Sequence, residues 1–349
     1  MSQSQVRIGI VGAGANTRAR HIPGFRAIDG VEIVSVANRS LESARQVASD
    51  FQIPQVIERW QDLVASPEID AVMIGTWPNM HCEVTCAALA AGKHVLCEAR
   101  MARDLAEARQ MLTASQAHPQ LVAQIVPSPF GLDVGARVRR LLDDNFIGDL
   151  REFVVLAADD QFWDYSKPLH WRQDSQLSGK NILAMGIMHE TLTRIIPDPT
   201  RVFAQGAIFE AQRPDPSIND YRNCDIPDSV QIVTQTATGA QGVYHLSGTV
   251  LYGPGKQIHL YGTRGTVKIV FGAREQVFTG HHSQSELREI DIPAAERGGW
   301  RVEAEFIGAI RGQEPVKYTT FADGVRYMEF TEAVGESLRR QVPIALPLA

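Results

Sequence analysis

The sequence lacks the features that mark several classes of protein. None of its apolar runs reaches the roughly 18 residues that a transmembrane helix needs, so we predict no membrane partner. Basic residues are not in excess, because 34 Lys and Arg stand against 40 Asp and Glu. The resulting net charge of −6 predicts no nucleic-acid partner. The start lacks the basic and apolar regions of a signal peptide, and neither internal repeats nor low-complexity stretches are visible.

Cysteine is also scarce, with four residues and no Cys-x-x-Cys pair. His81, Cys82 and Cys86 lie close together in sequence, but no second cluster of metal ligands accompanies them. Ordinary residues on a helix explain them better, and we predict no metal site. Few cysteines and no signal peptide together predict a reducing, cytoplasmic setting.

The first third of the sequence alternates strands with helices. Continuous apolar runs such as "VRIGIV" (6–11) predict strands that are covered on both faces. The predicted strands are 6–11, 31–38, 71–76, 94–98 and 121–126, with helices at 17–28, 41–51, 80–91 and after Arg103. Repeated strand–helix units predict a doubly wound, parallel Rossmann sheet, and therefore an α/β domain over residues 1–127.

The pattern changes after Pro127 and Pro129, which mark a domain boundary. From about residue 201 to residue 292, alternating strands joined by glycine-rich turns predict a large, mainly antiparallel sheet with one open face. Helices are predicted near 134–143, 181–195, 302–310 and 322–339. We therefore predict a second, α+β domain over residues 128–349.

A glycine turn, "VGAGANTRARH", follows the first strand and opens a helix. Gly12 permits a tight turn, and Gly14 lets the backbone approach a pyrophosphate at the helix N-terminus. Thr17 occupies the position of the third glycine, so this dinucleotide-binding fingerprint is incomplete. The strand and helix around it favour a nucleotide site, and the alternative is a purely structural turn.

The second strand ends with Asn38, Arg39 and Ser40 and carries no carboxylate for the ribose hydroxyls of NAD. Arg39 and Ser40 suit a 2′-phosphate, which favours NADP as the cofactor. Asn38 also suits a ribose, so NAD stays possible. Arg39 as a solvated surface cation is the other reading.

These features together resemble the Gfo/Idh/MocA family of oxidoreductases. The resemblance covers nearly the whole chain and adds "TWPNMH" (76–81), "AGKHVLCE" (91–98), "GTRGTVKI" (262–269) and "FADGVRYMEFTEAVGESLRRQVPIALP" (321–347) to the glycine turn. It implies an NAD(P) cofactor, a sugar, polyol or related substrate, and a homodimer or homotetramer assembled through the C-terminal sheet. It also places further residues at the cofactor, namely Asn16, Thr76, Pro78, Asn79, His81 and Glu98.

The sequence departs from this family where the family carries its catalytic lysine. The usual Glu-Lys-Pro at the end of the fifth strand reads Glu98-Ala99-Arg100 here. Arginine keeps its proton, so Arg100 cannot be a general base. It can orient a substrate or neutralise an oxyanion. The equal alternative places Arg100 on the outside of the turn, facing a phosphate or water.

A second departure affects the family's helix with Asp and His four residues apart. In "ILAMGIMHETLTR", alignment on Gly186 puts Ala184 and Met188 at those two positions. His189 is displaced by one residue, which turns its side chain by about 100°. It remains our first candidate for proton transfer, because imidazole titrates near neutral pH. A histidine satisfied by helix packing is the alternative.

The stretch "PLHWRQDSQLSGKN" (168–181) precedes that helix and matches the region that borders the substrate in the family. We predict that Trp171 stacks on a sugar face and that polar neighbours bind hydroxyl groups. Asp174 is the second candidate base. The substrate candidates are Tyr165, Trp171, Arg172 and Gln173. A plain polar loop would have the same composition.

Three hypotheses of function follow. The first is an NAD(P)-dependent oxidoreductase with an altered proton-transfer group. The second is a lyase or glycosidase that uses bound NAD without net turnover. The third is a non-catalytic, cofactor-binding regulatory protein.

Overall fold

The computed structural model describes residues 5–348, which fold into two compact units. The first unit holds the described residues up to Pro127 together with Arg301–Met328, and the second holds Ser128–Trp300 and the residues from Glu329 onward. The predicted boundary at residue 127 is therefore present, but the segment 301–328 belongs to the first unit rather than to the predicted second domain. The helix at Val302–Ile310 in this segment is apolar on one face, and its Phe306 packs edge-on against Phe25 with ring centroids 6.4 Å apart.

The first unit is built on a six-stranded sheet with the predicted parallel pairing. In spatial order its strands are β3 (Gln55–Val56), β2 (Val31–Ala37), β1 (Val6–Val11), β4 (Ala71–Ile74), β5 (His94–Cys97) and β6 (Ala123–Ile125). The central strands are buried on both faces, as their continuous apolar runs require. The prediction of an N-terminal Rossmann-like sheet is confirmed.

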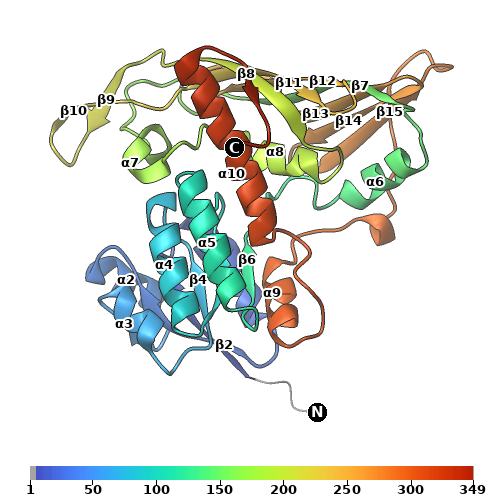
Figure 1. Ribbon diagram of the computed structural model, residues 1–349. Coiled ribbons are helices and arrows are strands. Elements are labelled where there is room, and N and C mark those ends of the chain that lie inside the picture. The colour runs from blue at the N-terminus through green and yellow to red at the C-terminus, as the bar shows by residue number, and fades with distance from the viewer. Residues whose placement is uncertain (1–4, 349) are drawn as a thin grey trace. The chain divides into compact units, whose positions relative to one another are not determined.

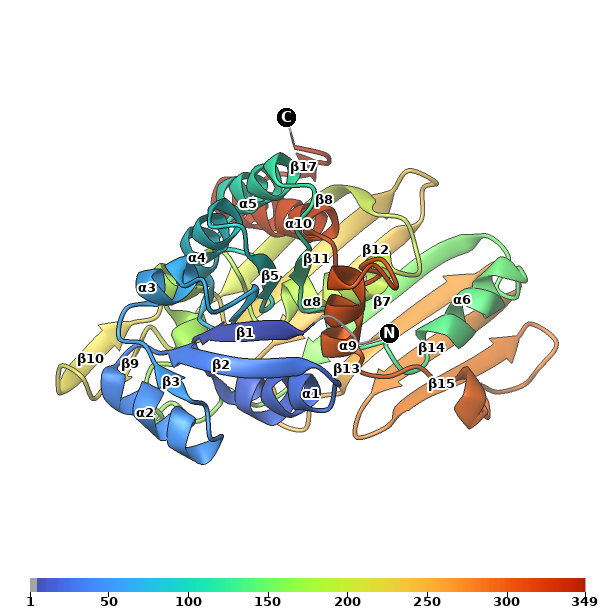
Figure 2. The same ribbon diagram turned by 90° about the horizontal axis from the view of Figure 1, so that it is seen from below.

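The helices of the first unit are α1 (Ile22–Arg26), α2 (Leu41–Asp50), α3 (Trp60–Ala65), α4 (Pro78–Ala90), α5 (Leu105–Ala117) and α9 (Val302–Ile310). In Figure 2, α3, α4 and α5 follow one another along one face of the sheet. The predicted helix 17–28 is divided into a π-helical turn, Thr17–His21, and α1. Pro23 has no N–H to continue the hydrogen bonding between the two parts. The short β3 and α3 were not predicted.

The second unit contains a nine-stranded sheet (Figure 1). In spatial order its strands are β16 (Arg288–Glu289), β15 (Glu275–His281), β14 (Gly265–Phe271), β13 (Gly255–Gly262), β7 (Leu150–Ala158), β12 (Gln241–Ser247), β11 (Ser229–Thr236), β8 (Pro199–Ala207) and β17 (Ile344–Ala345). Neighbouring strands are antiparallel apart from β7 and β12, which run parallel. The prediction of a mainly antiparallel sheet is confirmed. Because β7 and β12 are parallel, the loops that follow them leave the sheet at the same end of the strands.

Helices cover one face of this sheet, and Figure 1 shows α6 (Gly135–Asp143) and α8 (Met185–Thr193) on that face. The C-terminal half of α10 (Phe321–Arg340) adds Phe330 and Val334 to the same core. A separate hairpin joins β9 (Gln212–Asp215) to β10 (Asp220–Asn223). Short helical turns at Trp171–Gln173 (η2), Ser175–Ser178 (α7) and Ala294–Glu296 (η3) complete the unit. Within the described residues, no helix combines the length and apolar character needed to cross a membrane.

Candidate functional site

The glycine turn after β1 has the tight geometry that its sequence predicts. Gly12 has a φ of +84°, and a Cβ there would lie 2.6 Å from the side chain of Thr76. A Cβ at Gly14 would meet only the carbonyl oxygen of Gly75, at 3.3 Å. The surface above Gly14 is therefore open to a ligand, as a close approach of backbone to phosphate requires.

The missing third glycine is compensated across the sheet. A Cβ at Gly75 would lie 2.1 Å from the hydroxyl oxygen of Thr17 and 2.2 Å from the carbonyl oxygen of Gly12. The space that a third glycine would leave in the turn is thus supplied by Gly75 at the end of β4. Thr17 is fully buried, so the turn remains compact with a larger side chain.

The tip of β2 uses two of its three predicted residues for structure. The side-chain oxygen of Asn38 accepts a hydrogen bond from the backbone N–H of Ala13 at 2.7 Å, which ties the tip to the glycine turn. The Ser40 hydroxyl caps α2 by accepting from the N–H of Ser43 at 3.2 Å. The guanidinium of Arg39 lies over the Trp77 ring, 5.6 Å from its centroid. Arg39 is therefore the positively charged side chain at the tip of β2.

The segment after β4 contains buried polar atoms that the described residues leave without a hydrogen-bond partner. These atoms are Oγ1 of Thr76 and Oδ1 of Asn79. Unsatisfied buried polar atoms are costly, and a ligand or a water molecule that reaches them supplies the missing partner. With the open surface above Gly14, they fit a bound dinucleotide. Pro78 begins α4, in the first turn, where a missing N–H costs nothing.

His81 has a structural position within the same unit. One ring nitrogen lies 2.9 Å from the carbonyl oxygen of Arg100, and the other lies 3.0 Å from that of Thr76. Burial lowers the pKa of His81, and the ring connects the segments that follow β4 and β5 through these two contacts. The Arg100 side chain is buried, 3% exposed, which contradicts the alternative that placed it on the outside of the turn.

Glu98 lies at the centre of a hydrogen-bonded cluster at the end of β5. Its Oε1 accepts from the amide of Asn16 at 2.5 Å and lies 3.0 Å from Nε2 of His21. The other nitrogen of His21 contacts Glu303 of α9 at 2.5 Å. Sequence reasoning missed His21 and Glu303. His21 follows the glycine turn closely and was a visible signal, whereas Glu303 lies 282 residues further along the chain.

The predicted substrate residues gather in the second unit, on the loop that follows β7. The Arg172 guanidinium stacks on the Trp171 ring, 4.1 Å from its centroid, and His170 caps this turn. Gln173 is buried, and its side-chain oxygen accepts from the N–H of His170. Asp174 caps α7 and pairs with Arg222 of the hairpin at 2.9 Å.

The same loop is held by a second arginine that sequence reasoning missed. Arg213 of β9 is 1% exposed and donates hydrogen bonds to the backbone oxygens of Phe162 and Asp164. Its guanidinium also lies 5.2 Å from the centre of the Tyr165 ring. The loop therefore has a fixed conformation that depends on the β9–β10 hairpin.

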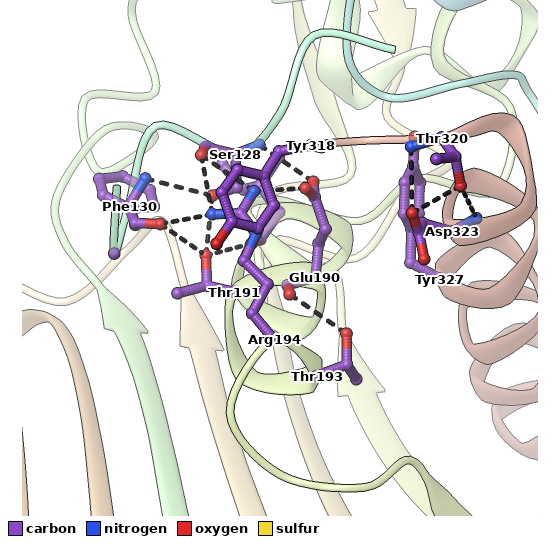
Figure 3. Close-up of polar contacts among 12 residues, drawn as sticks. Ser128, Phe130, Glu190, Thr191, Thr193, Arg194, Tyr318, Thr320, Asp323 and Tyr327 are labelled. Atoms are coloured by element: carbon purple, nitrogen blue, oxygen red, sulfur yellow. Dashed lines mark hydrogen bonds and ion pairs between the residues drawn. The ribbon is translucent and has the colours of Figure 1, made fainter. Parts of the chain in front are cut away.

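His189 is buried within α8 of the second unit. Its Nδ1 lies 2.8 Å from the hydroxyl of Tyr244, and Nε2 lies 3.7 Å from a carboxylate oxygen of Asp198. The ring stacks on Phe330. The adjacent Glu190 is taken up elsewhere, because it accepts from the N–H of Ser128 and pairs with Arg194 (Figure 3). His189, not Glu190, is thus our candidate for proton transfer on α8, and its catalytic role stays a prediction.

The sequence profile described as "Oxidoreductase family, NAD-binding Rossmann fold" matches residues 6–124. The profile of the "GFO/IDH/MocA C-terminal domain" matches residues 136–268.

Curated relatives align over part of the chain. An uncharacterised oxidoreductase of Rhizobium meliloti is 28% identical over 202 residues, which are 57% of this chain and 59% of that protein. The 1,5-anhydro-D-fructose reductase of Ensifer adhaerens is 38% identical over 110 residues, 32% of this chain and 33% of the reductase. The chain thus spans less than two thirds of the length of these two relatives.

The structure of a levoglucosan dehydrogenase in complex with NADH is similar throughout. It superposes with a TM-score of 0.89, covers 99% of this chain and 100% of the dehydrogenase, and is 21% identical in sequence. At this identity the likeness establishes the fold.

Proposed function

Because the chain belongs to the GFO/IDH/MocA family of NAD-binding oxidoreductases, we propose that it is an NAD(P)-dependent oxidoreductase acting on a cyclic sugar, polyol or related compound. The observation that carries this proposal is the open glycine turn of the first unit with unpartnered polar atoms in the segment after β4. Gly14 leaves its backbone open to a ligand, and the buried oxygens of Thr76 and Asn79 have no partner among the described residues.

The cofactor is held by residues of the first unit. The backbone from Gly12 to Thr17 receives the pyrophosphate, and Thr76 and Asn79 supply polar contacts beside it. Arg39 binds a 2′-phosphate, which makes NADP the preferred cofactor, while NAD remains the ligand if Arg39 only covers the Trp77 ring. When bound, the cofactor exchanges a hydride with the substrate.

Proton transfer uses a group other than the family's lysine, because Ala99 stands at that position. His189 is the first candidate, and its neighbour Asp198, whose side chain is 39% exposed, offers a route for the proton to solvent. Asp174 is the second, and its carboxylate is already engaged in an ion pair with Arg222 of the hairpin. Arg100 orients the substrate or stabilises negative charge on oxygen.

The substrate loop suits a carbohydrate. Trp171 offers an aromatic surface for a sugar ring, and Arg172, Gln173 and Tyr165 supply hydrogen-bonding groups nearby. The names of two similar proteins, 1,5-anhydro-D-fructose reductase and levoglucosan dehydrogenase, support a cyclic sugar as the substrate class.

The open face of the nine-stranded sheet supports a homodimer or homotetramer. Phe203, Val233, Val243 and Val154 lie in one row across four strands, because each pairs in register with the next. Val233 and Val243 are 51% and 43% exposed. A row of apolar side chains on an exposed sheet is the usual mark of a surface covered by another subunit.

The proposed function is tested by mixing the purified protein with NADP or NAD and a panel of cyclic sugars and polyols. We expect the absorbance of reduced nicotinamide to rise with at least one of them, faster with NADP. Sugar conversion without net formation of reduced nicotinamide would point instead to lyase or glycosidase chemistry. Cofactor binding without any conversion would favour a regulatory protein.

A further inference from the structure

A buried histidine joins the glycine-turn helix to the end of β5 in the first unit. His21 is completely buried and lies between two carboxylates, 3.0 Å from Oε1 of Glu98 and 2.5 Å from Oε1 of Glu303. The same Glu98 oxygen accepts a hydrogen bond from Asn16, and the second oxygen accepts from the N–H of Ala99 at 3.2 Å. Glu98 is therefore fixed from three sides.

This arrangement depends on a close approach between α1 and α9. A Cβ at Gly24 would lie 2.7 Å from the carboxylate carbon of Glu303, so only glycine allows that carboxylate to reach His21. The Phe25 and Phe306 rings pack edge-on beside it. Glu303 is thus carried by a rigid contact between two helices.

The charges of the cluster reinforce one another. Burial opposes the charged imidazole, but the hydrogen bonds to Glu303 and Glu98 outweigh it and raise the pKa of His21 to about 9. Burial likewise opposes ionisation of Glu98, yet His21 and Asn16 hold the pKa of Glu98 below its usual range. Near neutral pH these shifts favour a charged imidazolium of His21 beside a charged carboxylate of Glu98.

Such a buried chain of charges is a poor device for stability alone, because well-packed apolar residues serve a core at least as well. The exposure of its members indicates its direction. The side chain of Glu98 is 14% exposed, whereas those of His21 and Glu303 are 0% and 4% exposed. Glu98 is thus the member of the cluster that is most accessible to a ligand.

We propose that His21 is a positioning residue of the cofactor site, which with Glu303 holds the Glu98 carboxylate charged and oriented as a hydrogen-bond acceptor for the bound dinucleotide. The inference rests on the proposed function, because it assumes that a nicotinamide dinucleotide binds beside Glu98. It also assigns Glu98 a fixed negative charge, since protonating it would weaken the contacts with His21 and Asn16. Glu98 is accordingly not the group that replaces the missing lysine.

The test compares the binding of NADPH and of NADH by four forms of the full chain, measured by cofactor fluorescence from about pH 6 to about pH 10. The forms are the parent, His21→Gln, Glu303→Gln and the control Glu83→Gln, which removes an exposed carboxylate of α4. Circular dichroism verifies folding. The groups that titrate around His21 are Glu98 and Glu303, and His81 also acts on Glu98.

We expect the parent to bind its preferred cofactor with constant affinity near neutral pH, and we expect this affinity to fall as pH passes about 9. His21→Gln should weaken binding on the order of 10- to 100-fold near pH 7, the range for a lost hydrogen bond to a charged group. Glu303→Gln keeps the histidine but removes one carboxylate, so the pH at which binding weakens should fall by about one unit or more. Glu83→Gln should match the parent.

If the parent binds neither NADH nor NADPH, the proposed function fails. If the parent binds but folded His21→Gln binds equally well with an unchanged pH profile, the positioning role is overturned while the proposed function stands. Should His21→Gln not fold, Glu303→Gln decides, because an unshifted pH profile in that variant overturns the inference.

Discussion

The imidazole of His189 lies flat on the ring of Phe330, with ring centroids 3.6 Å apart and planes inclined by 10°. Burial raises the pKa of the neighbouring Tyr244, whose hydroxyl contacts the same imidazole. The phenol therefore stays protonated and keeps the ring in place. A role in packing and a role in proton transfer predict different effects of substitution, so the two roles can be separated.

His189→Asn keeps part of the hydrogen bonding and removes the titrating group. If His189 transfers the proton, turnover should fall by about 10²- to 10⁴-fold with cofactor affinity unchanged. Phe330→Leu is the matched control, because it removes the stacking partner but leaves the histidine, and it should lose stability while retaining most of its turnover. A loss of less than about threefold in folded His189→Asn, far below the acid–base range, would assign His189 to packing. Asp174→Asn would then be tested.

Arg39→Ala should separate the two cofactors. A charge-assisted contact with the 2′-phosphate is worth about 1.5–3 kcal/mol, so NADPH binding should weaken on the order of 10- to 100-fold while NADH binding changes little. Arg59→Ala, which removes an exposed arginine ahead of α3, is the control. Equal weakening of both cofactors, or tighter NADH binding by the parent, would remove the phosphate role of Arg39.

The fold was predictable because its signals are local. Continuous apolar runs and caps such as Ser40 defined the strands and helices of the first unit. The assignment of α9 to the first unit was not predictable, because its apolar face does not specify a partner in sequence. Contacts such as Phe25 with Phe306 form only in three dimensions.

The candidate site was predictable in part for the same reason. The glycine turn and the end of β5 follow from spacing along the chain. Two other features depend on residues that are far apart in sequence. They are the close packing of Thr17 against Gly75 and the pairing of His21 with Glu303. Asn38 and Ser40 are residue types that suit a nucleotide site. They suit equally well the structural hydrogen bonds that they make here, so the sequence alone does not separate the two roles.

The oligomer prediction concerns the open sheet face. Val243→Lys places a charge in the middle of the apolar row and should convert the parent assembly to monomers, because burying an unpaired ammonium is costly. Thr113→Lys adds the same charge at an exposed position of α5 and should leave assembly unchanged. Sedimentation at micromolar concentration distinguishes the forms. A monomeric parent would contradict the prediction.

The His21 cluster predicts a loss of stability at alkaline pH. The folded-state pKa of about 9 exceeds the ordinary 6.5, so the stabilisation is complete below about pH 6.5 and disappears as pH rises through 9. The shift corresponds to about 3 kcal/mol. We expect the urea midpoint of the parent to fall over this range and that of His21→Gln to change less. Parallel pH curves for the two forms would refute the prediction.

The last prediction concerns the brace between the β9–β10 hairpin and the substrate loop. Arg213 holds the backbone oxygens of Phe162 and Asp164 from a fully buried position, so Arg213→Gln leaves at least one of them without its donor. Unsatisfied buried groups of this kind cost about 1–3 kcal/mol each.

We expect Arg213→Gln to lower the free energy of unfolding by a similar amount and to loosen the loop that carries Tyr165 and Trp171. Because the loop is proposed to bind the substrate, KM for the sugar should rise about tenfold or more while cofactor affinity stays constant. Arg288→Gln, at an exposed arginine of β16, is the control and should alter neither quantity. An increased KM for the cofactor with an unchanged KM for the sugar would show that the loop serves the dinucleotide instead. Proteolysis at the loop, faster in Arg213→Gln than in the control, would provide an independent measure of the loosening.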